Sequence, residues 1–195
     1  MATSFDSDPL LERLRRLEPL AFDTLYQREK DGLYGFLLRL ARDPHTAADL
    51  FQNVWLKLAR HAPRLRPDSN LRAWLFTVAR HEYVSFRRAQ ALDLSRLLVL
   101  GLQPERPTPG TELDLRLVEL DAAFAELGDA DREVLLLSVT EGLDARAGAL
   151  VLGISPPAFR QRLARARRRL DERLATRAEA DRRLSEAPAP LRGGR

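Results

Sequence analysis

The sequence predicts an all-α fold of two small helical domains, an N-terminal helical bundle and a C-terminal helix-turn-helix, joined by a flexible linker. Apolar residues recur at spacings of three and four, and no run alternates at period two. Residues 103–111 contain three prolines and a glycine and separate the two periodic parts. Residues 153–156 supply a turn glycine and a helix start between two short periodic stretches.

Length and composition limit the classes of protein that fit. A chain of 195 residues, 45% hydrophobic and 31% charged, is typical of one ordinary globular domain or two small ones. The absence of cysteine excludes disulfides, thiolate zinc sites and cysteine catalysis. No apolar run approaches the roughly 20 residues of a membrane helix, and the N-terminus lacks a signal-peptide pattern. We therefore expect no membrane insertion and a cytoplasmic location.

The first domain is expected over residues 18–90, with three helices. Apolar residues three and four apart predict a helix over residues 20–42. Asp43 and Pro44 then form an N-cap and a first-turn proline, so a second helix begins there and ends before Pro63.

A third helix is expected over residues 71–88, with Ser69 or Asn70 as its N-cap. Beyond it the apolar period weakens. The remaining segments are expected to be a linker over 91–114, a helical domain over 115–175 and a disordered tail over 176–195.

Charge is segregated along the chain. Residues 60–90 contain seven arginines against two acids, and residues 158–170 contain six arginines and no acid. Residues 112–146, between them, contain ten acids against three arginines. Two basic patches favour two contacts with one polyanion, since arginine–phosphate contacts supply much of the affinity for nucleic acids. The alternative is that these helices are solvated faces of an arginine-rich protein.

The second helix has a candidate docking face. Its apolar residues fill one arc, and the opposite arc places Asp49, Gln52 and Asn53 around Leu56. A leucine ringed by carboxylate and amide groups has the composition of a protein-binding patch. The alternative is an ordinary surface, because single exposed leucines are common.

The third helix mixes aromatic residues with arginines on one face. Guanidinium groups can hold phosphates while bases stack on the rings, which suits a single strand. The preceding loop adds small polar groups that could hold an unstacked base. Alternatively, Phe76 and Tyr83 pack against a neighbouring helix, an interpretation we favour for Phe76. The candidate single-strand contacts are Arg66, Ser69, Asn70, Arg72, Phe76, Arg80, Tyr83 and Arg87.

The C-terminal part has the pattern of a helix-turn-helix. Asp144 is a plausible N-cap, Gly153 suits a left-handed turn, and the helix after Ser155 has one apolar stripe with cations elsewhere. Such a helix can lie in a major groove, and a helical hairpin that binds no DNA is the alternative. In the groove, Pro157 and Ala158 would meet thymine methyls, Arg160 or Gln161 would read base edges, and Arg162, Arg165 and Arg168 would hold phosphates.

These stretches together resemble bacterial RNA polymerase sigma factors of the extracytoplasmic-function group. Asp-Leu-Phe-Gln-Asn-Val-Trp at 49–55 is similar to the region that binds the polymerase clamp. Residues 71–80 resemble the segment that melts and reads the minus-ten element. Leu-Gly-Ile-Ser at 152–155, with residues 159–167, is similar to the helix that reads the minus-thirty-five element. The resemblance implies polymerase contacts at Asp49, Leu50 and Gln52, and upstream DNA contacts at Ser155, Arg160, Arg162 and Arg165.

The partners that the resemblance implies are core RNA polymerase and promoter DNA, with an anti-sigma factor for many members of the family. The chain has neither a Gly-rich phosphate loop nor a nucleophile–base cluster, and its three histidines are scattered. We therefore expect no enzymatic activity, no cofactor and no metal site. Two alternatives remain: a stand-alone helix-turn-helix regulator that dimerises through its first domain, and a sigma-like decoy without promoter activity.

Several positions depart from the family pattern. Asn53 replaces a usual glutamate, and His81 and Ser85 replace an asparagine and an aspartate. Residues 144–149, Asp-Ala-Arg-Ala-Gly-Ala, replace roughly Ser-Tyr-x-Glu-Ile-Ala. Gly148 weakens that helix by about 1 kcal/mol relative to alanine, and the sequence gives no reason for it. We expect a divergent member with altered docking and an altered minus-ten preference.

Overall fold

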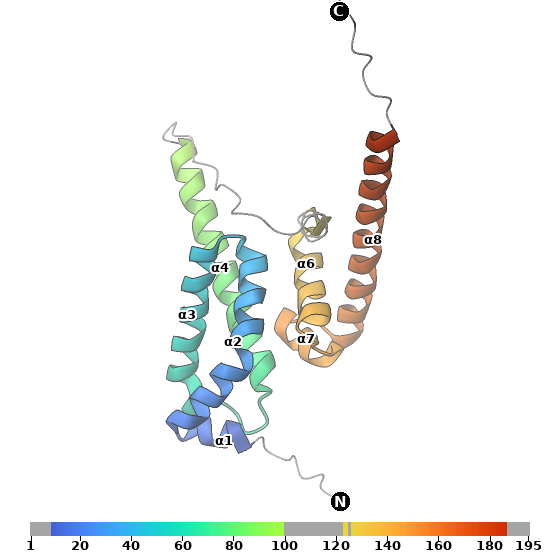
Figure 1. The fold of residues 1–195 in the computed structure, drawn as a ribbon. Helices are drawn as coiled ribbons and strands as arrows, with labels where there is room; N and C mark the ends of the chain where they lie inside the picture. The colour runs from blue at the N-terminus through green and yellow to red at the C-terminus, as the bar shows by residue number, and fades with distance from the viewer. Residues whose placement is uncertain (1–8, 100–122, 125, 187–195) are drawn as a thin grey trace, which may run out of the picture.

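The computed structural model describes residues 9–99, 123–124 and 126–186, and every regular element within these ranges is a helix. The helices form two blocks that lie side by side (Figure 1). This arrangement confirms the predicted all-α class with two helical parts. In chain order the elements are α1 (Pro9–Arg15), α2 (Pro19–Ala41), α3 (Pro44–His61), η1 (Ala62–Arg64), α4 (Leu71–Val99), α6 (Asp129–Leu135), η2 (Leu136–Thr140), α7 (Ala145–Leu152) and α8 (Pro156–Glu186).

The first block is a bundle of α2, α3 and α4, with α1 packed against α2 and η1. Each long helix has one apolar stripe, and Phe36, Leu58 and Leu75 are fully buried where the stripes meet. Helix α1 is an addition to the predicted elements, because seven residues are too few to show a period. Its Leu11 and Leu14 are buried, so the first block begins before residue 18.

Local capping chemistry sets the helix starts where the sequence predicts them. The Asp43 carboxylate accepts hydrogen bonds from the Thr46 hydroxyl and from the Thr46 backbone N–H, the latter at 2.7 Å. The hydroxyl bond and, second to it, the backbone bond lower the pKa of Asp43. Asn70 Oδ1 accepts from the Ala73 N–H at 2.9 Å and caps α4. The predicted start of the second helix and the predicted cap of the third are confirmed.

In the second block, α6 continues directly into one π-helical turn, η2. The Glu141 N–H donates to the Leu136 carbonyl at 2.9 Å, a bond that spans five residues. Helices α7 and α8 then form a helix-turn-helix, with Gly153 in the left-handed conformation (φ 65°) between them. Phe159 and Ala166 of α8 are buried against this unit, as the apolar stripe predicts.

Gly148 allows α7 and α8 to approach each other. A Cβ atom at this position would overlap the Cε2 and Cζ atoms of Phe159. The Phe159 ring is only 1% exposed, so it has little space into which to move. The glycine that the sequence leaves unexplained is therefore required by the packing of the two helices.

Two predicted helix ends are wrong. Helix α4 continues to Val99, well into the segment predicted as a linker from residue 91. Helix α8 continues to Glu186, although residues from 176 onward are predicted to be disordered. Figure 1 shows both helices projecting beyond the body of their blocks. The rest of the predicted linker, residues 100–114, and the end of the predicted tail, residues 187–195, lie outside the described residues.

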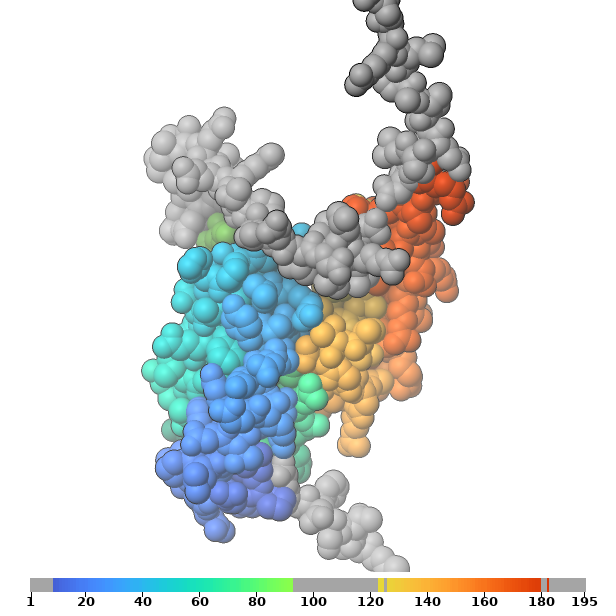
Figure 2. Space-filling model, in the orientation of Figure 1, coloured from blue at the N-terminus to red at the C-terminus, as the bar shows by residue number. Residues whose placement is uncertain are grey.

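The two blocks pack against each other. Buried residues of both belong to one continuous apolar cluster, and α4 contacts α7 while α2 contacts η2. Figure 2 shows the second block seated against the flank of the first. None of the helices in the described part of the chain is both long enough and apolar enough to cross a membrane.

Candidate polymerase and nucleic-acid interfaces

The exposed side of α3 carries most of the predicted polymerase contacts. Asp49, Gln52 and Asn53 are exposed around Leu56, whose side chain is 46% exposed. We call these four residues the docking face. An apolar centre with a polar rim has the composition of a protein–protein interface.

Leu50 does not belong to the docking face. Its side chain is only 5% exposed and packs in the apolar core, on the same stripe as Val54 and Leu58. Successive residues on a helix are rotated by about 100°, so Leu50 turns inward where Asp49 faces solvent. The expectation that the Leu50 side chain contacts polymerase is corrected to a core role.

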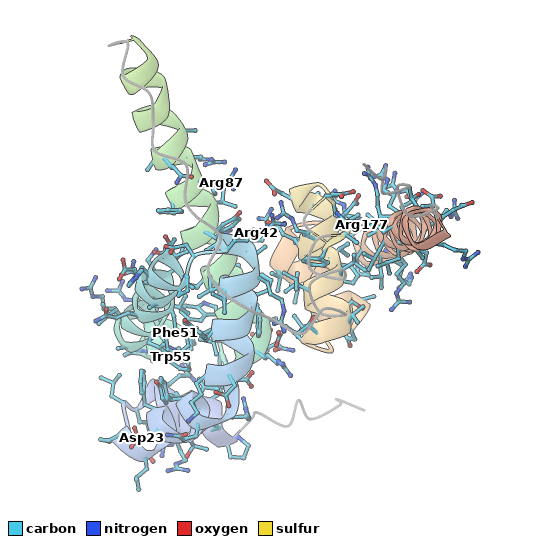
Figure 3. The ribbon with its side chains drawn as sticks, turned by 45° about the horizontal axis from the view of Figure 1, so that its top comes forward. Asp23, Arg42, Phe51, Trp55, Arg87 and Arg177 are labelled. Atoms are coloured by element: carbon cyan, nitrogen blue, oxygen red, sulfur yellow. The ribbon has the colours of Figure 1, made fainter. Side chains whose placement is uncertain are left out.

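Interlocked aromatic rings support the docking face from behind. Tyr26 of α2 meets Phe51 and Trp55 of α3 edge to face, with ring centroids 6.1 and 4.9 Å apart. Phe22 and Tyr34 of α2 extend the cluster by contacts with Trp55 and Phe51. Figure 3 labels Phe51 and Trp55 on α3. Such contacts restrict side-chain motion, so α3 is held rigidly against α2.

The loop before α4 presents small polar groups on a short turn. Arg66 is exposed and forms a two-bond ion pair with Asp68, each bond 3.2 Å long. The Ser69 N–H donates to the Arg66 carbonyl at 3.0 Å and closes the turn. Because the side-chain oxygen of Asn70 caps α4, only the side-chain NH2 group of this exposed residue is left to meet a ligand. The structure therefore brings Arg66, Ser69 and Asn70 together.

Two arginines of α4 already face carboxylates. Arg72 Nε lies 3.3 Å from Glu29 of α2, and its Nη2 lies 3.4 Å from Glu141, which follows η2. Arg80 Nε donates to Glu133 of α6 at 2.9 Å. All three carboxylates are buried. Burial raises the pKa of Glu141, and the opposing attraction of Arg72 and Arg39 is the smaller effect.

The two aromatic residues of the predicted single-strand face are buried. Phe76 is fully buried against Phe36, with ring centroids 5.2 Å apart, and the Arg72 guanidinium lies over its outer side. Tyr83 is 3% exposed, and its hydroxyl accepts a hydrogen bond from Arg87 at 3.3 Å. Neither ring can stack on a base in this conformation. For Phe76 this confirms the packing interpretation that the sequence favoured. The exposed position expected for Tyr83 is corrected to a core position, whereas Arg87 is exposed (Figure 3).

The helix-turn-helix is capped at both junctions. The Asp144 carboxylate accepts hydrogen bonds from the backbone N–H groups of Arg146 and Ala147, at 3.0 and 2.7 Å. After α7, the Ile154 N–H donates to the Ala149 carbonyl at 3.0 Å. Ser155 Oγ then accepts from the Ala158 N–H at 3.3 Å and starts α8. Ser155 therefore lies at the first turn, as predicted, with its oxygen already engaged.

The arginines of α8 divide into two sets. Arg169 pairs with Asp131 of α6, and Arg173 and Arg177 both pair with Glu126, which lowers the pKa of Glu126. The arginines nearer the helix start form no ion pair with any described residue. With the neighbouring predicted contacts they make up the face that we call the recognition face: Ser155, Pro157, Ala158, Arg160, Gln161, Arg162, Arg165 and Arg168.

Pro157, Arg160, Gln161, Arg165 and Arg168 are exposed, and Ala158 and Arg162 are half-buried. The sequence identified these positions. It did not show that Glu126 and Asp131 pair with the later arginines of α8, because ion pairs between distant segments leave no local pattern. Within the described part of the chain, no group of three or more His, Asp or Glu side chains is arranged to hold a metal ion.

The sequences of both blocks match known protein families. Residues 25–92 match the family model of sigma-70 region 2, and residues 117–170 match that of sigma-70 region 4. The extracytoplasmic-function (ECF) sigma factor SigM of Bacillus subtilis is 30% identical over 77% of this chain and 93% of its own length. The sigma factor CarQ of Myxococcus xanthus is 31% identical over 84% of this chain and 95% of its own length.

Solved structures agree with these sequence matches. The sigma factor RpoE of Bartonella quintana, in complex with the anti-sigma factor NepR, is 27% identical with a TM-score of 0.66, over 79% of this chain and 96% of its own. CnrH, in complex with the cytosolic domain of CnrY, shares the fold with a TM-score of 0.65 at 24% identity, over 86% of this chain and 96% of its own. Both blocks and their order along the chain are therefore those of one family: the protein is an RNA polymerase sigma factor of the extracytoplasmic-function group, which directs transcription initiation at specific promoters.

Proposed function

We propose that the docking face of α3 binds core RNA polymerase and that the two blocks then contact promoter DNA at separate places. The loop at residues 65–70, with Arg72, Arg80 and Arg87, holds the non-template strand of the minus-ten element. The recognition face of α8 binds the minus-thirty-five duplex, and the part of the predicted linker that follows α4, residues 100–114, sets the distance between the two contacts. Strand opening costs a few kcal/mol per unstacked base, and the contacts of the assembled complex must offset that cost.

The observation that best supports this proposal is the recognition face itself. Arg160, Arg165 and Arg168 are exposed on one helix without an acidic partner among the described residues, directly after a capped turn. Exposed cations on such a helix can hold phosphates on either side of a groove while its first turn meets the base edges.

These surfaces also indicate which tasks belong to the chain and which belong to polymerase. The chain contributes binding groups, and we propose that it performs no catalysis of its own and acts in the cytoplasm, where core polymerase is. The Bartonella quintana relative is bound by the anti-sigma factor NepR. We extend this to the present chain and propose that an anti-sigma factor regulates it.

Co-elution with core RNA polymerase in gel filtration tests the docking face. Leu56→Arg puts a charge at the centre of the face, and we expect the affinity for core enzyme to fall about tenfold or more. Leu20→Arg is the matched control, because Leu20 is 70% exposed on α2 and lies outside the face. Equal losses for both variants would contradict the assignment of the face. An unmodified chain that never co-elutes would contradict the proposed docking.

Binding of promoter fragments by the holoenzyme tests the recognition face. Arg160→Ala should relax the preference at one base pair by about 1–3 kcal/mol, because Arg160 is placed to read a base edge. Arg168→Ala should instead weaken binding equally for all sequences and reduce its dependence on salt, as expected for a phosphate contact. Losses that are equal and independent of sequence for both variants would contradict this orientation of α8.

A further inference from the structure

The corner where α1 meets η1 carries two cations that have no acidic partner in the described part of the chain. Arg16 directly follows α1, and Arg64 is the last residue of η1. Both side chains are exposed, whereas Arg13 and Arg15 of α1 pair with glutamates at 2.8 and 2.9 Å. The exposed positive charge of the first block therefore does not end at the loop before α4.

Helix α1 is fixed against η1 by apolar contacts. The two elements touch, and Leu11 and Leu14 of α1 are fully buried in the same apolar cluster as Leu65, the residue that follows η1. Figure 1 shows α1 at the same end of the bundle as the connection between α3 and α4. Because Leu65 also begins the loop of residues 65–70, α1 and this loop are held in a fixed relation.

The backbone at Arg16 is held by a closed helix end. The Leu17 N–H donates to the Leu14 carbonyl at 2.9 Å, and the Glu18 N–H donates to the Arg13 carbonyl at 3.1 Å. With Leu17 in the left-handed conformation (φ 59°), these two bonds form a Schellman motif in which Arg16 is the C-cap. The Arg16 side chain therefore starts from a fixed point of the corner.

The corner follows next when the proposed strand-binding surface is traced from α4 toward the loop. The proposed contacts of the minus-ten strand run from Arg87 along α4 to Arg72 and then to the loop of residues 65–70. Arg64 directly precedes this loop. The second block is attached through the far end of α4, so the upstream DNA lies at that end. A strand that continues past the loop therefore reaches Arg64 and Arg16 with its downstream part.

We propose that Arg64 and Arg16 bind phosphates of the non-template strand on the downstream side of the minus-ten element. This inference rests on the proposed function, since the loop of residues 65–70 must hold that strand first. A guanidinium group donates two parallel hydrogen bonds to a phosphate, so each arginine can hold one linkage without reading a base. Such contacts keep the open strand from returning to its complement and add affinity that does not depend on sequence.

Binding of single-stranded probes by the holoenzyme tests the site. The probes are non-template oligonucleotides from a promoter that the holoenzyme transcribes in a run-off assay. One probe ends at the minus-ten element, and the other continues several nucleotides further downstream. We expect Arg16→Ala and Arg64→Ala to bind the short probe as the parent does and the long probe more weakly. The slope of log Kd against log salt concentration for the long probe should fall by about 0.7 for each arginine removed.

Two further variants control for charge and for general effects. Arg16→Lys keeps a cation at the corner, so it should retain most of the affinity for the long probe. Arg167→Ala removes an exposed arginine of α8 that has no acidic partner among the described residues, and it should leave the binding of both probes unchanged. All of these side chains are exposed, so each variant should keep the parental circular dichroism and co-elute with core enzyme. A loss for the long probe in Arg167→Ala as large as in Arg64→Ala would overturn the proposal.

Neutral linkages locate the contact on the strand. A methylphosphonate replaces one charged phosphate linkage by a neutral one. Downstream of the minus-ten element, this change should weaken binding of the parent but not of the variant that combines Arg16→Ala with Arg64→Ala, because the lost charge no longer has a partner. An equal loss in both proteins would assign the downstream strand to core polymerase and overturn the site. A parent chain that makes no transcripts from any promoter refutes the proposed function, whereas transcripts together with that equal loss refute only the downstream contact.

Discussion

Gly148→Ala should destabilise the second block although alanine is the better helix former. The gain in helix propensity is about 1 kcal/mol. Against it stands the overlap of the new Cβ with the ring edge of Phe159, a rigid side chain that is 1% exposed. Forcing an extra methyl group into a packed core costs roughly 1–3 kcal/mol. Because the ring cannot swing into solvent, we expect the upper part of that range and a net loss of about 1–2 kcal/mol in the free energy of unfolding.

Urea denaturation followed by circular dichroism measures this loss, and a double-mutant cycle assigns its cause. In a Phe159→Leu background the overlap is relieved, so Gly148→Ala should become neutral or stabilising, with a coupling energy of about 2 kcal/mol. Gly35→Ala on α2 is the control, because a Cβ there meets only the flexible end of Arg39. A Gly148→Ala chain that gains stability as Gly35→Ala does would refute the reasoning.

Two further predictions concern single sites. Asp144→Ala should cost about 1 kcal/mol in urea denaturation, because it removes the acceptor for the N–H groups of Arg146 and Ala147, the second and third residues of α7. Leu17→Gly should stabilise the chain by roughly 1 kcal/mol, because Leu17 has φ 59° and is 59% exposed, so it has strain to lose and little packing.

Helix starts could be predicted from the sequence because capping is local. Asp43, Asn70 and Asp144 each bond to an N–H group two or three residues further on, so the pattern that reveals the cap also contains its partner. Gly153 is equally local, since a left-handed residue after a helix favours glycine. These positions needed no knowledge of the tertiary fold.

Helix ends were harder to predict because nothing local stops these helices. Residues 88–99 and 176–186 contain neither proline nor glycine and are rich in alanine, leucine, arginine and glutamate, which favour helix. The loss of the apolar period signals only that the helix has left the core. It does not end the backbone hydrogen bonding, so α4 and α8 extend beyond the predicted boundaries.

In the candidate interfaces, too, the sequence predicted some positions correctly and others wrongly. Wheel positions separate the exposed Asp49 and Leu56 from the buried arc of α3, and the structure agrees with them. Phe76 is buried, as the favoured interpretation predicted, but Tyr83 was wrongly expected to be exposed. Helix α4 is covered on more than one side, whereas a wheel drawn for an isolated helix shows only one core direction. How many neighbours a helix has is a tertiary property.

The acidic segment between the two basic patches has a different role from the one that its position in the sequence indicates. Read along the chain, residues 112–146 separate two polyanion-binding patches. In the structure, Glu133 and Glu141 bind arginines of α4, while Glu126 and Asp131 bind arginines of α8. The paired arginines on α8 lie from residue 169 onward, so the positive potential that remains is concentrated on the first turns of that helix. Neutralising one part of a cationic helix directs a long-range attraction to the part left bare. Glu126→Gln should therefore strengthen binding of the free chain to duplex DNA while making it less dependent on the recognition face, which Arg160→Ala in the same background would measure.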